Sequence, residues 1–202
     1  MLRVACKFVG FLLCAYGTIS IAAAQLIDTG PVTDRQAAFV RGGDIIIADG
    51  PGIFETFDTP YVAIGYRSPS ISFGMEHNRL SLEGELSHFR TSEQSDIGID
   101  IIDTNVWALP ILASVRWQWD WDFPIRPYAA AGGGAVYTRL SVEDSFSNFD
   151  TTEFSSGLLG RSGIEASLTK DFSLEAGYRY LRVDADSAFG VHGAELGVVW
   201  RF

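Results

Sequence analysis

The stretch that decides the fold is residues 194–202, AELGVVWRF. Read with a period of two residues, one face carries apolar side chains: Ala194, Leu196, Val198, Trp200 and Phe202. The opposite face carries Glu195, Gly197, Val199 and Arg201. This alternation predicts a β-strand with one face against an apolar environment. Because exposed chain ends usually fray, an aromatic residue closing such a strand indicates that the strand is held firmly to the end.

The same alternation recurs along most of the chain. It predicts eight strands over residues 38–48, 60–67, 79–90, 105–119, 125–140, 153–168, 172–183 and 191–202. In several of them a continuous apolar face lies opposite small, polar or charged residues, which suits the narrow interior of an eight-stranded barrel. In water, the apolar faces would instead line the core of a soluble barrel or sandwich. A given apolar side chain would point outward in a membrane barrel and inward in a soluble fold.

The placement of aromatic residues favours a membrane barrel over a soluble fold. One group lies near one end of its strands and comprises Trp117, Trp119, Tyr128 and Phe172. A second group near the other end comprises Trp107, Phe154 and Tyr180. Two aromatic belts about one bilayer apart are typical of a membrane barrel. Tyr137 fits this scheme only if a bulge in Gly132–Gly134 reverses the side-chain parity along its strand.

Connection lengths point the same way. The turns at 120–124 and 170–171 are short, with 68–78 as an exception, whereas longer loops are expected at 49–59, 91–104, 141–152 and 184–190. Short periplasmic turns and longer extracellular loops are the barrel pattern. The loops are acidic and contain no Lys or Arg. They are candidates for binding divalent cations or a basic surface partner, although plain solvation explains them as well.

The first residues predict export. Arg3 and Lys7 precede an apolar run that ends at Ala22–Ala24, so residues 1–24 form a predicted cleaved signal peptide. Residues 25–36 are a polar lead-in, and residues 37–202 are the predicted barrel domain. Both cysteines, Cys6 and Cys14, lie in the signal. The net charge of −10 becomes −12 once the two signal cations are removed, which argues against nucleic-acid binding.

Together these features resemble the small OmpA-like and porin-family eight-stranded outer-membrane β-barrel proteins of Gram-negative bacteria. The resemblance implies an all-β, transmembrane, antiparallel up-and-down barrel located in the cell outer membrane. It implies outer-membrane lipids, lipopolysaccharide and the barrel assembly machinery as partners. It also implies that the last strand is a C-terminal assembly signal, formed by Leu196, Val198, Trp200 and Phe202.

Nine charged residues fall on the inward parity of the predicted barrel: Glu83, Glu85, Arg116, Arg161, Glu165, Glu175, Arg179, Glu195 and Arg201. Opposite charges in a narrow interior are expected to pair, because an unpaired charge at low dielectric is costly. They form either a structural plug or a gated ion path. Open aqueous channels need about sixteen strands, which favours the plug.

Catalysis is not expected. The histidines are His77, His88 and His192, and the strongest candidate group is His192 with Ser187 and Asp186. Neither a zinc-binding pattern nor a nucleotide-binding fingerprint occurs, so no catalytic residue, metal site or cofactor is predicted. The expected function is a structural or surface-interaction role in the envelope. The alternatives are a narrow passive pore for small solutes or ions, an outer-leaflet lipid-modifying enzyme, and a soluble lipocalin-like binder.

Overall fold

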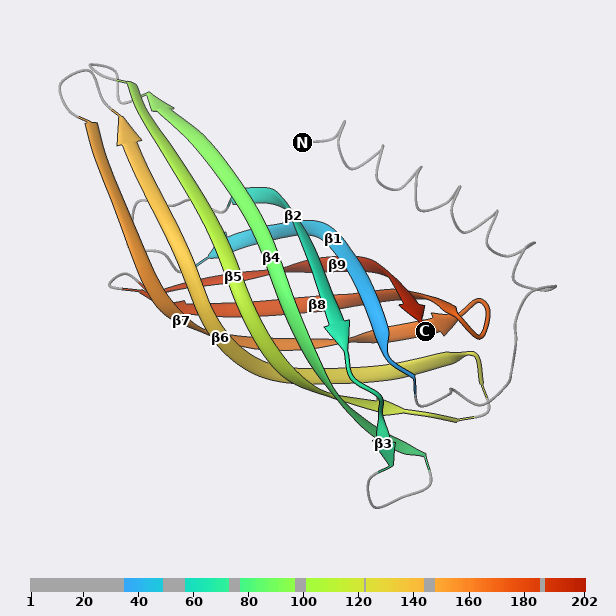
Figure 1. Cartoon of the computed structure of the whole chain (residues 1–202). Coiled ribbons are helices and arrows are strands. Elements are labelled where there is room, and N and C mark those ends of the chain that lie inside the picture. Colours follow the sequence, from blue (N-terminus) through green and yellow to red (C-terminus); the bar gives the residue numbers. More distant parts are fainter. Residues whose placement is uncertain are drawn as a thin grey trace, which may run out of the picture.

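The computed structural model describes residues 35–48, 57–72, 77–96, 101–121, 123–143, 148–185 and 188–202. Its strands are β1 (Ala37–Ala48), β2 (Phe57–Arg67), β3 (Ile71–Ser72), β4 (Asn78–Asp96), β5 (Ile101–Trp119), β6 (Ile125–Glu143), β7 (Asn148–Ser167), β8 (Phe172–Asp184) and β9 (Phe189–Arg201). Neighbouring strands pair antiparallel, β1 pairs with both β2 and β9, and β2 pairs with β4. Eight long strands therefore close into a barrel, as predicted (Figure 1).

The barrel wall is apolar on its outside. Outward-facing residues such as Leu82, Ile111 and Leu196 have 53–62% of their surface exposed. Their sequence neighbours point inward and are buried, because successive residues of a strand face opposite sides. A soluble barrel would bury the large apolar residues instead. The observed faces are those predicted for a barrel that sits in lipid.

The barrel has two distinguishable ends. At the loop end, the strands are joined through residues 49–56, 97–100, 144–147 and 185–188. At the turn end, they are joined through residues 68–77, 120–124 and 168–171. The connection at 68–77 includes β3, which pairs with Leu80 and Arg79 of β4.

Strands β4 to β7 are 19 or 20 residues long, whereas β1, β2, β8 and β9 have 11 to 13. Strands β4 to β7 run beyond the other strands at the loop end (Figure 1). The loops predicted at 91–104 and 141–152 are therefore largely strand, with ladder pairs such as Asp96↔Ile101 and Glu143↔Asn148. Sequence alternation missed this extension because a sheet with water on both faces needs no apolar face.

Strand β6 contains no bulge. Its pairing with β5 and with β7 keeps one register from end to end. Tyr128 is consequently buried inside the barrel, and Tyr137 lies on the outer side. The bulge proposed at Gly132–Gly134 to place both tyrosines in lipid is wrong, because the constant register makes their parities opposite.

The barrel interior is layered. Towards the loop end, it holds an apolar cluster that includes Ile45, Phe89, Leu112, Leu181 and Val191. A small second cluster of Ala37, Phe39 and Val199 lies towards the turn end. Charged side chains occupy the interior from the first cluster to the turn end, around the second cluster. No helix among the described residues is long and apolar enough to cross a membrane. The predicted signal peptide lies outside the described residues.

Candidate functional site

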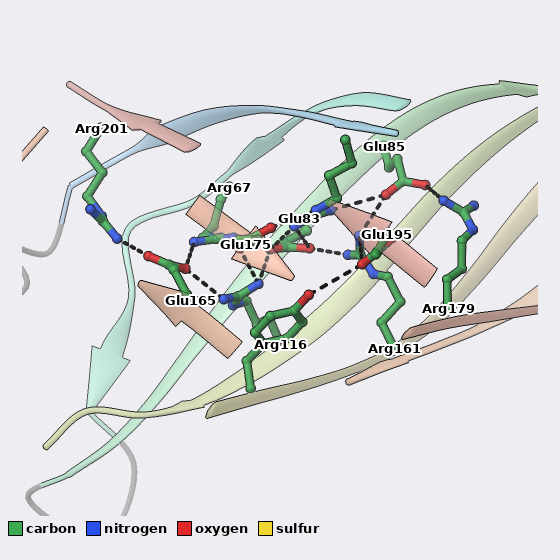
Figure 2. Close-up of polar contacts among 12 residues, drawn as sticks. Arg67, Glu83, Glu85, Arg116, Arg161, Glu165, Glu175, Arg179, Glu195 and Arg201 are labelled. Carbon is green, nitrogen blue, oxygen red and sulfur yellow. Dashed lines mark hydrogen bonds and ion pairs between the residues drawn. The ribbon is translucent and has the colours of Figure 1, made fainter. Parts of the chain in front are cut away.

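The charged layer of the barrel interior is the candidate site, and it is organised around three guanidinium groups. Arg67, at the end of β2, contacts three carboxylates: Nε lies 2.8 Å from Glu83 Oε1, Nη1 2.9 Å from Glu165 Oε2 and Nη2 2.6 Å from Glu175 Oε1. Arg116, on β5, contacts the same carboxylates at 3.4, 2.7 and 2.7 Å. Five strands on opposite sides of the barrel, β2, β4, β5, β7 and β8, are thereby connected (Figure 2).

Arg41 and its neighbours carry the network towards the loop end. Arg41 Nε donates to Glu175 Oε2 at 2.8 Å, and its Nη atoms lie 3.2 Å from Glu83 and 3.3 Å from Glu85. Glu85 accepts further contacts from Arg161 at 2.9 Å and Arg179 at 2.6 Å. Arg161 also pairs with Glu83. Each of these carboxylates therefore has more than one cationic partner.

Glu195 is held mainly by phenol groups. The Tyr61 hydroxyl donates to Glu195 Oε2 at 2.6 Å and the Tyr128 hydroxyl to Oε1 at 3.4 Å, while Arg161 lies 4.0 Å away. Tyr128 reaches this position because Gly163 and Gly177 leave room for it. A Cβ atom at either glycine would lie 2.9 or 2.7 Å from the hydroxyl oxygen. Small residues opposite a large one thus make the interior pack.

Aromatic rings also shield the cations. The guanidinium carbon of Arg116 lies 3.6 Å from the ring centre of Tyr128, and that of Arg41 lies 3.7 Å from the ring centre of Phe39. Such cation–π contacts strengthen when the cation is removed from water. They replace part of the hydration that these buried cations lose.

The network continues to the turn end. Arg201 pairs with Glu165, and Arg126 donates to Ser167. Arg126 also lies 2.8 Å from Asp120, a residue of the turn between β5 and β6. The ion pairs therefore extend from the apolar cluster to the turn end of the barrel.

This arrangement neutralises charge and fills space. Six arginines face five glutamates in the central layer: Arg41, Arg67, Arg116, Arg161, Arg179 and Arg201 against Glu83, Glu85, Glu165, Glu175 and Glu195. All eleven are buried. The cations are in slight excess, and the Nε atoms of Arg116 and Arg161 have no hydrogen-bond partner in the described chain. A network this interconnected holds its side chains in place.

The nine predicted interior charges all lie in this layer, and each one contacts at least one other member of the set. Sequence reasoning missed Arg41, Arg67 and Tyr61. The inward position of Arg67 could have been predicted, because the alternation of its strand puts it on the face opposite Val62, Ile64 and Tyr66. Arg41 carried none, because both faces of its strand contain apolar residues and small ones.

Six of the seven predicted belt residues lie on the outer wall. Trp117, Trp119, Phe154, Phe172 and Tyr180 are exposed, and Trp107 is half-buried against His88 and Tyr137. Tyr128 is not a belt residue. Tyr128 shares the side-chain parity of the buried residues Arg126 and Ala130, so it faces inward and takes part in the interior network, and its prediction as a belt residue is wrong.

The three histidines make contacts outside the interior charge network. His77 Nδ1 lies 2.9 Å from the backbone oxygen of Asp120, and His88 packs against Trp107. His192 Nδ1 lies 2.8 Å from the Tyr178 hydroxyl on the outer wall. Asp186 and Ser187, the other members of the candidate catalytic group, lie outside the described residues. No group of three metal-ligating side chains is present within the described ranges.

Comparison with known proteins gives consistent results. A family model described as "outer membrane protein beta-barrel domain" matches residues 49–202. An uncharacterised protein of Brucella abortus (strain 2308) is 25% identical over 166 residues, covering 70% of this chain and 57% of the relative. The chain therefore spans little more than half the length of this relative.

Two solved structures share the fold. Neisserial surface protein A superposes with a TM-score of 0.55 at 18% identity, covering 83% of this chain and 97% of that one. Ail, the attachment invasion locus protein of Yersinia pestis, was solved in complex with the heparin analogue sucrose octasulfate. It gives a TM-score of 0.52 at 15% identity, covering 83% and 98%.

Proposed function

The chain belongs to the outer membrane protein β-barrel domain family, and from that premise we propose that it is a non-enzymatic integral outer-membrane barrel with a structural or surface-interaction role in the cell envelope. In this proposal a cleaved signal peptide exports it, and outer-membrane lipids, lipopolysaccharide and the barrel assembly machinery are its partners. One observation carries the structural role. The interior is filled by a paired charge network and an apolar cluster stacked along the barrel axis.

This filling argues against the pore. An ion crossing the barrel would have to displace buried arginine–glutamate pairs and then pass Leu112, Leu181 and Val191, which offer it no polar group. Both barriers lie in series. A narrow passive pore would require them to open together.

We expect the purified barrel to be silent in planar lipid bilayers, with no stepwise conductance in 1 M KCl. The refolded state would be verified by its heat-dependent mobility on gels. A general porin measured in the same chamber is the positive control. Reproducible unitary steps from folded protein that change in size in the Glu175→Gln variant would establish the pore instead.

We assign no catalytic role to the histidines. His192 faces outward, with Nδ1 occupied by the Tyr178 hydroxyl, and not by a serine or a carboxylate. The remaining two histidines contact a backbone carbonyl and an indole. A nucleophile–base pair needs both groups within hydrogen-bond reach.

A surface role is favoured by the extension of β4–β7. These strands run past the rest of the barrel at the loop end, and Phe149, Asp150, Thr151 and Thr152 are exposed there. Asp150 pairs with Arg139 of β6, with Nε 3.0 Å from Oδ1. Acidic residues near this end make divalent cations or a basic partner the candidate ligands. The names of the two structural neighbours, a surface protein and an attachment protein, agree with this assignment.

The surface role predicts that the extension is accessible from outside the cell. A Thr151→Cys variant should react with a membrane-impermeant maleimide on intact cells, whereas Lys170→Cys, in the turn between β7 and β8, should react only after the outer membrane is permeabilised. Cys6 and Cys14 are replaced by serine in both. The reverse pattern of labelling would place the extension in the periplasm and end the surface role.

A further inference from the structure

Two buried guanidinium groups of the interior layer each keep one hydrogen-bond donor that no described residue accepts. These donors are the Nε–H groups of Arg116 and Arg161. The Nη atoms of both side chains contact carboxylates, so only the Nε positions are open. Arg116 is 0% and Arg161 is 4% exposed. A buried donor without an acceptor is costly, and it indicates an acceptor that the chain itself does not supply.

The two donors belong to side chains that flank a single small residue. Ala130 of β6 pairs with Arg116 of β5 on one side and with Arg161 of β7 on the other. All three residues are buried, and the two arginines rise from the same side of the barrel wall (Figure 2). Cβ atoms directly opposite each other on neighbouring strands are about 4.5–5.5 Å apart, so the two arginine Cβ atoms are about 10 Å apart. Between them the wall contributes only the methyl group of Ala130.

The charge of the central layer is not balanced by its own residues. Six arginines and five glutamates leave one positive charge in excess. The hydroxyl groups of Tyr61 and Tyr128 donate to Glu195, so neither tyrosine supplies a negative charge. Arg126, nearer the turn end, has its own partner in Asp120. Because an uncompensated charge is costly at low dielectric, the layer requires one further negative charge.

We propose that a small inorganic anion of the halide class, with chloride as the ordinary occupant, is bound above Ala130 between Arg116 Nε and Arg161 Nε. The anion accepts one hydrogen bond from each Nε–H group and supplies the negative charge that the layer lacks. Hydrogen bonds in which the partners are ionised are stronger than those between neutral groups. A water molecule would accept the same two hydrogens but would leave the excess charge in place. The anion is thus a structural part of the filled interior.

The first test is the chloride dependence of stability. Urea unfolding of the chain is measured in lipid vesicles while sodium chloride is replaced stepwise by sodium gluconate, a much bulkier anion, at constant ionic strength. Because the site exists only in the folded barrel, the unfolding equilibrium constant should fall by up to tenfold for each tenfold rise in chloride concentration. Equal stability in chloride and in gluconate would overturn the proposal and would favour a bound water molecule.

A matched pair of substitutions at Ala130 locates the anion. Ala130→Asp places a carboxylate between the two Nε–H groups, whereas Ala130→Asn places a neutral group of nearly the same size there. The unfolding equilibrium constant of Ala130→Asp should be at least tenfold lower than that of Ala130→Asn, and it should no longer depend on chloride. Heat-dependent mobility on gels verifies that both variants form the barrel. An Ala130→Asp variant that is less stable than Ala130→Asn, or that keeps the chloride dependence of the wild type, would overturn the proposed site.

Discussion

Replacing Arg116 by alanine is expected to destabilise the barrel by about 3–5 kcal/mol, the cost typical of breaking a buried ion pair by removing one partner. Arg116 is fully buried and contacts Glu83, Glu165 and Glu175. Its removal leaves these carboxylates short of positive charge at low dielectric. It also removes the cation that stacks on Tyr128.

The measurement is equilibrium unfolding in urea, from lipid vesicles, followed by the gel mobility of unheated samples. Arg182→Ala is the matched control. Arg182 is an exposed arginine that contacts Asp184 at 3.2 Å, and losing an exposed pair costs about 1 kcal/mol or less. The double variant Arg116→Ala with Glu175→Gln should recover part of the loss, because it removes one of the uncompensated charges. Equal stability of Arg116→Ala and Arg182→Ala would mean that the network contributes nothing to the fold.

Placing arginine at Ile111 is expected to cost about 2–4 kcal/mol, the penalty of a cation at the middle of a bilayer. Ile111 lies on the outer wall of β5 between Trp107 and Trp117, with 53% of its surface exposed. In a soluble protein, a substitution at such an exposed site would change stability by no more than about 0.5 kcal/mol. The substitution therefore separates a wall in lipid from a wall in water.

The same urea titration is used here, in vesicles made of lipids with acyl chains of defined length. Ser92→Arg is the control, since Ser92 is exposed on β4 and pairs with Asn105 in the extension beyond the belt residue Trp107. It should change stability little. Thicker bilayers should enlarge the effect at Ile111 and not at Ser92. If the Ile111→Arg variant were as stable as the wild type, this would contradict the membrane-embedded orientation of the barrel.

The alternation of residues was sufficient to predict the fold. It located all eight long strands and the outward side of residues such as Leu82 and Leu196, because the side-chain period of a strand is fixed at two by covalent geometry. It also predicted nine interior charges, since polar residues opposite a face that contacts lipid point inward. The soluble alternative shares the same alternation, and only the closed barrel with its apolar exterior distinguishes the two.

The alternation of apolar and polar residues failed as a predictor where the two faces of a strand do not differ in polarity along its whole length. In the extension of β4–β7, no face needs to be apolar, so the sequence pattern predicts loops where the structure has strands. In β1, apolar residues occupy both faces, because the interior changes from charged to apolar along the strand. Arg41 lies inward within the same short strand as Ile45 and Ile47, so the sequence holds no sign that one side is polar.

The sequence by itself determined the strands, their faces and the presence of interior charges of both signs, because these depend on local geometry and on the bilayer as solvent. Only the tertiary structure decided which charges meet and that Tyr128 turns inward to Glu195. Those pairings depend on the register between strands distant in the chain. Register is set by the closure of the whole barrel, which no single segment encodes.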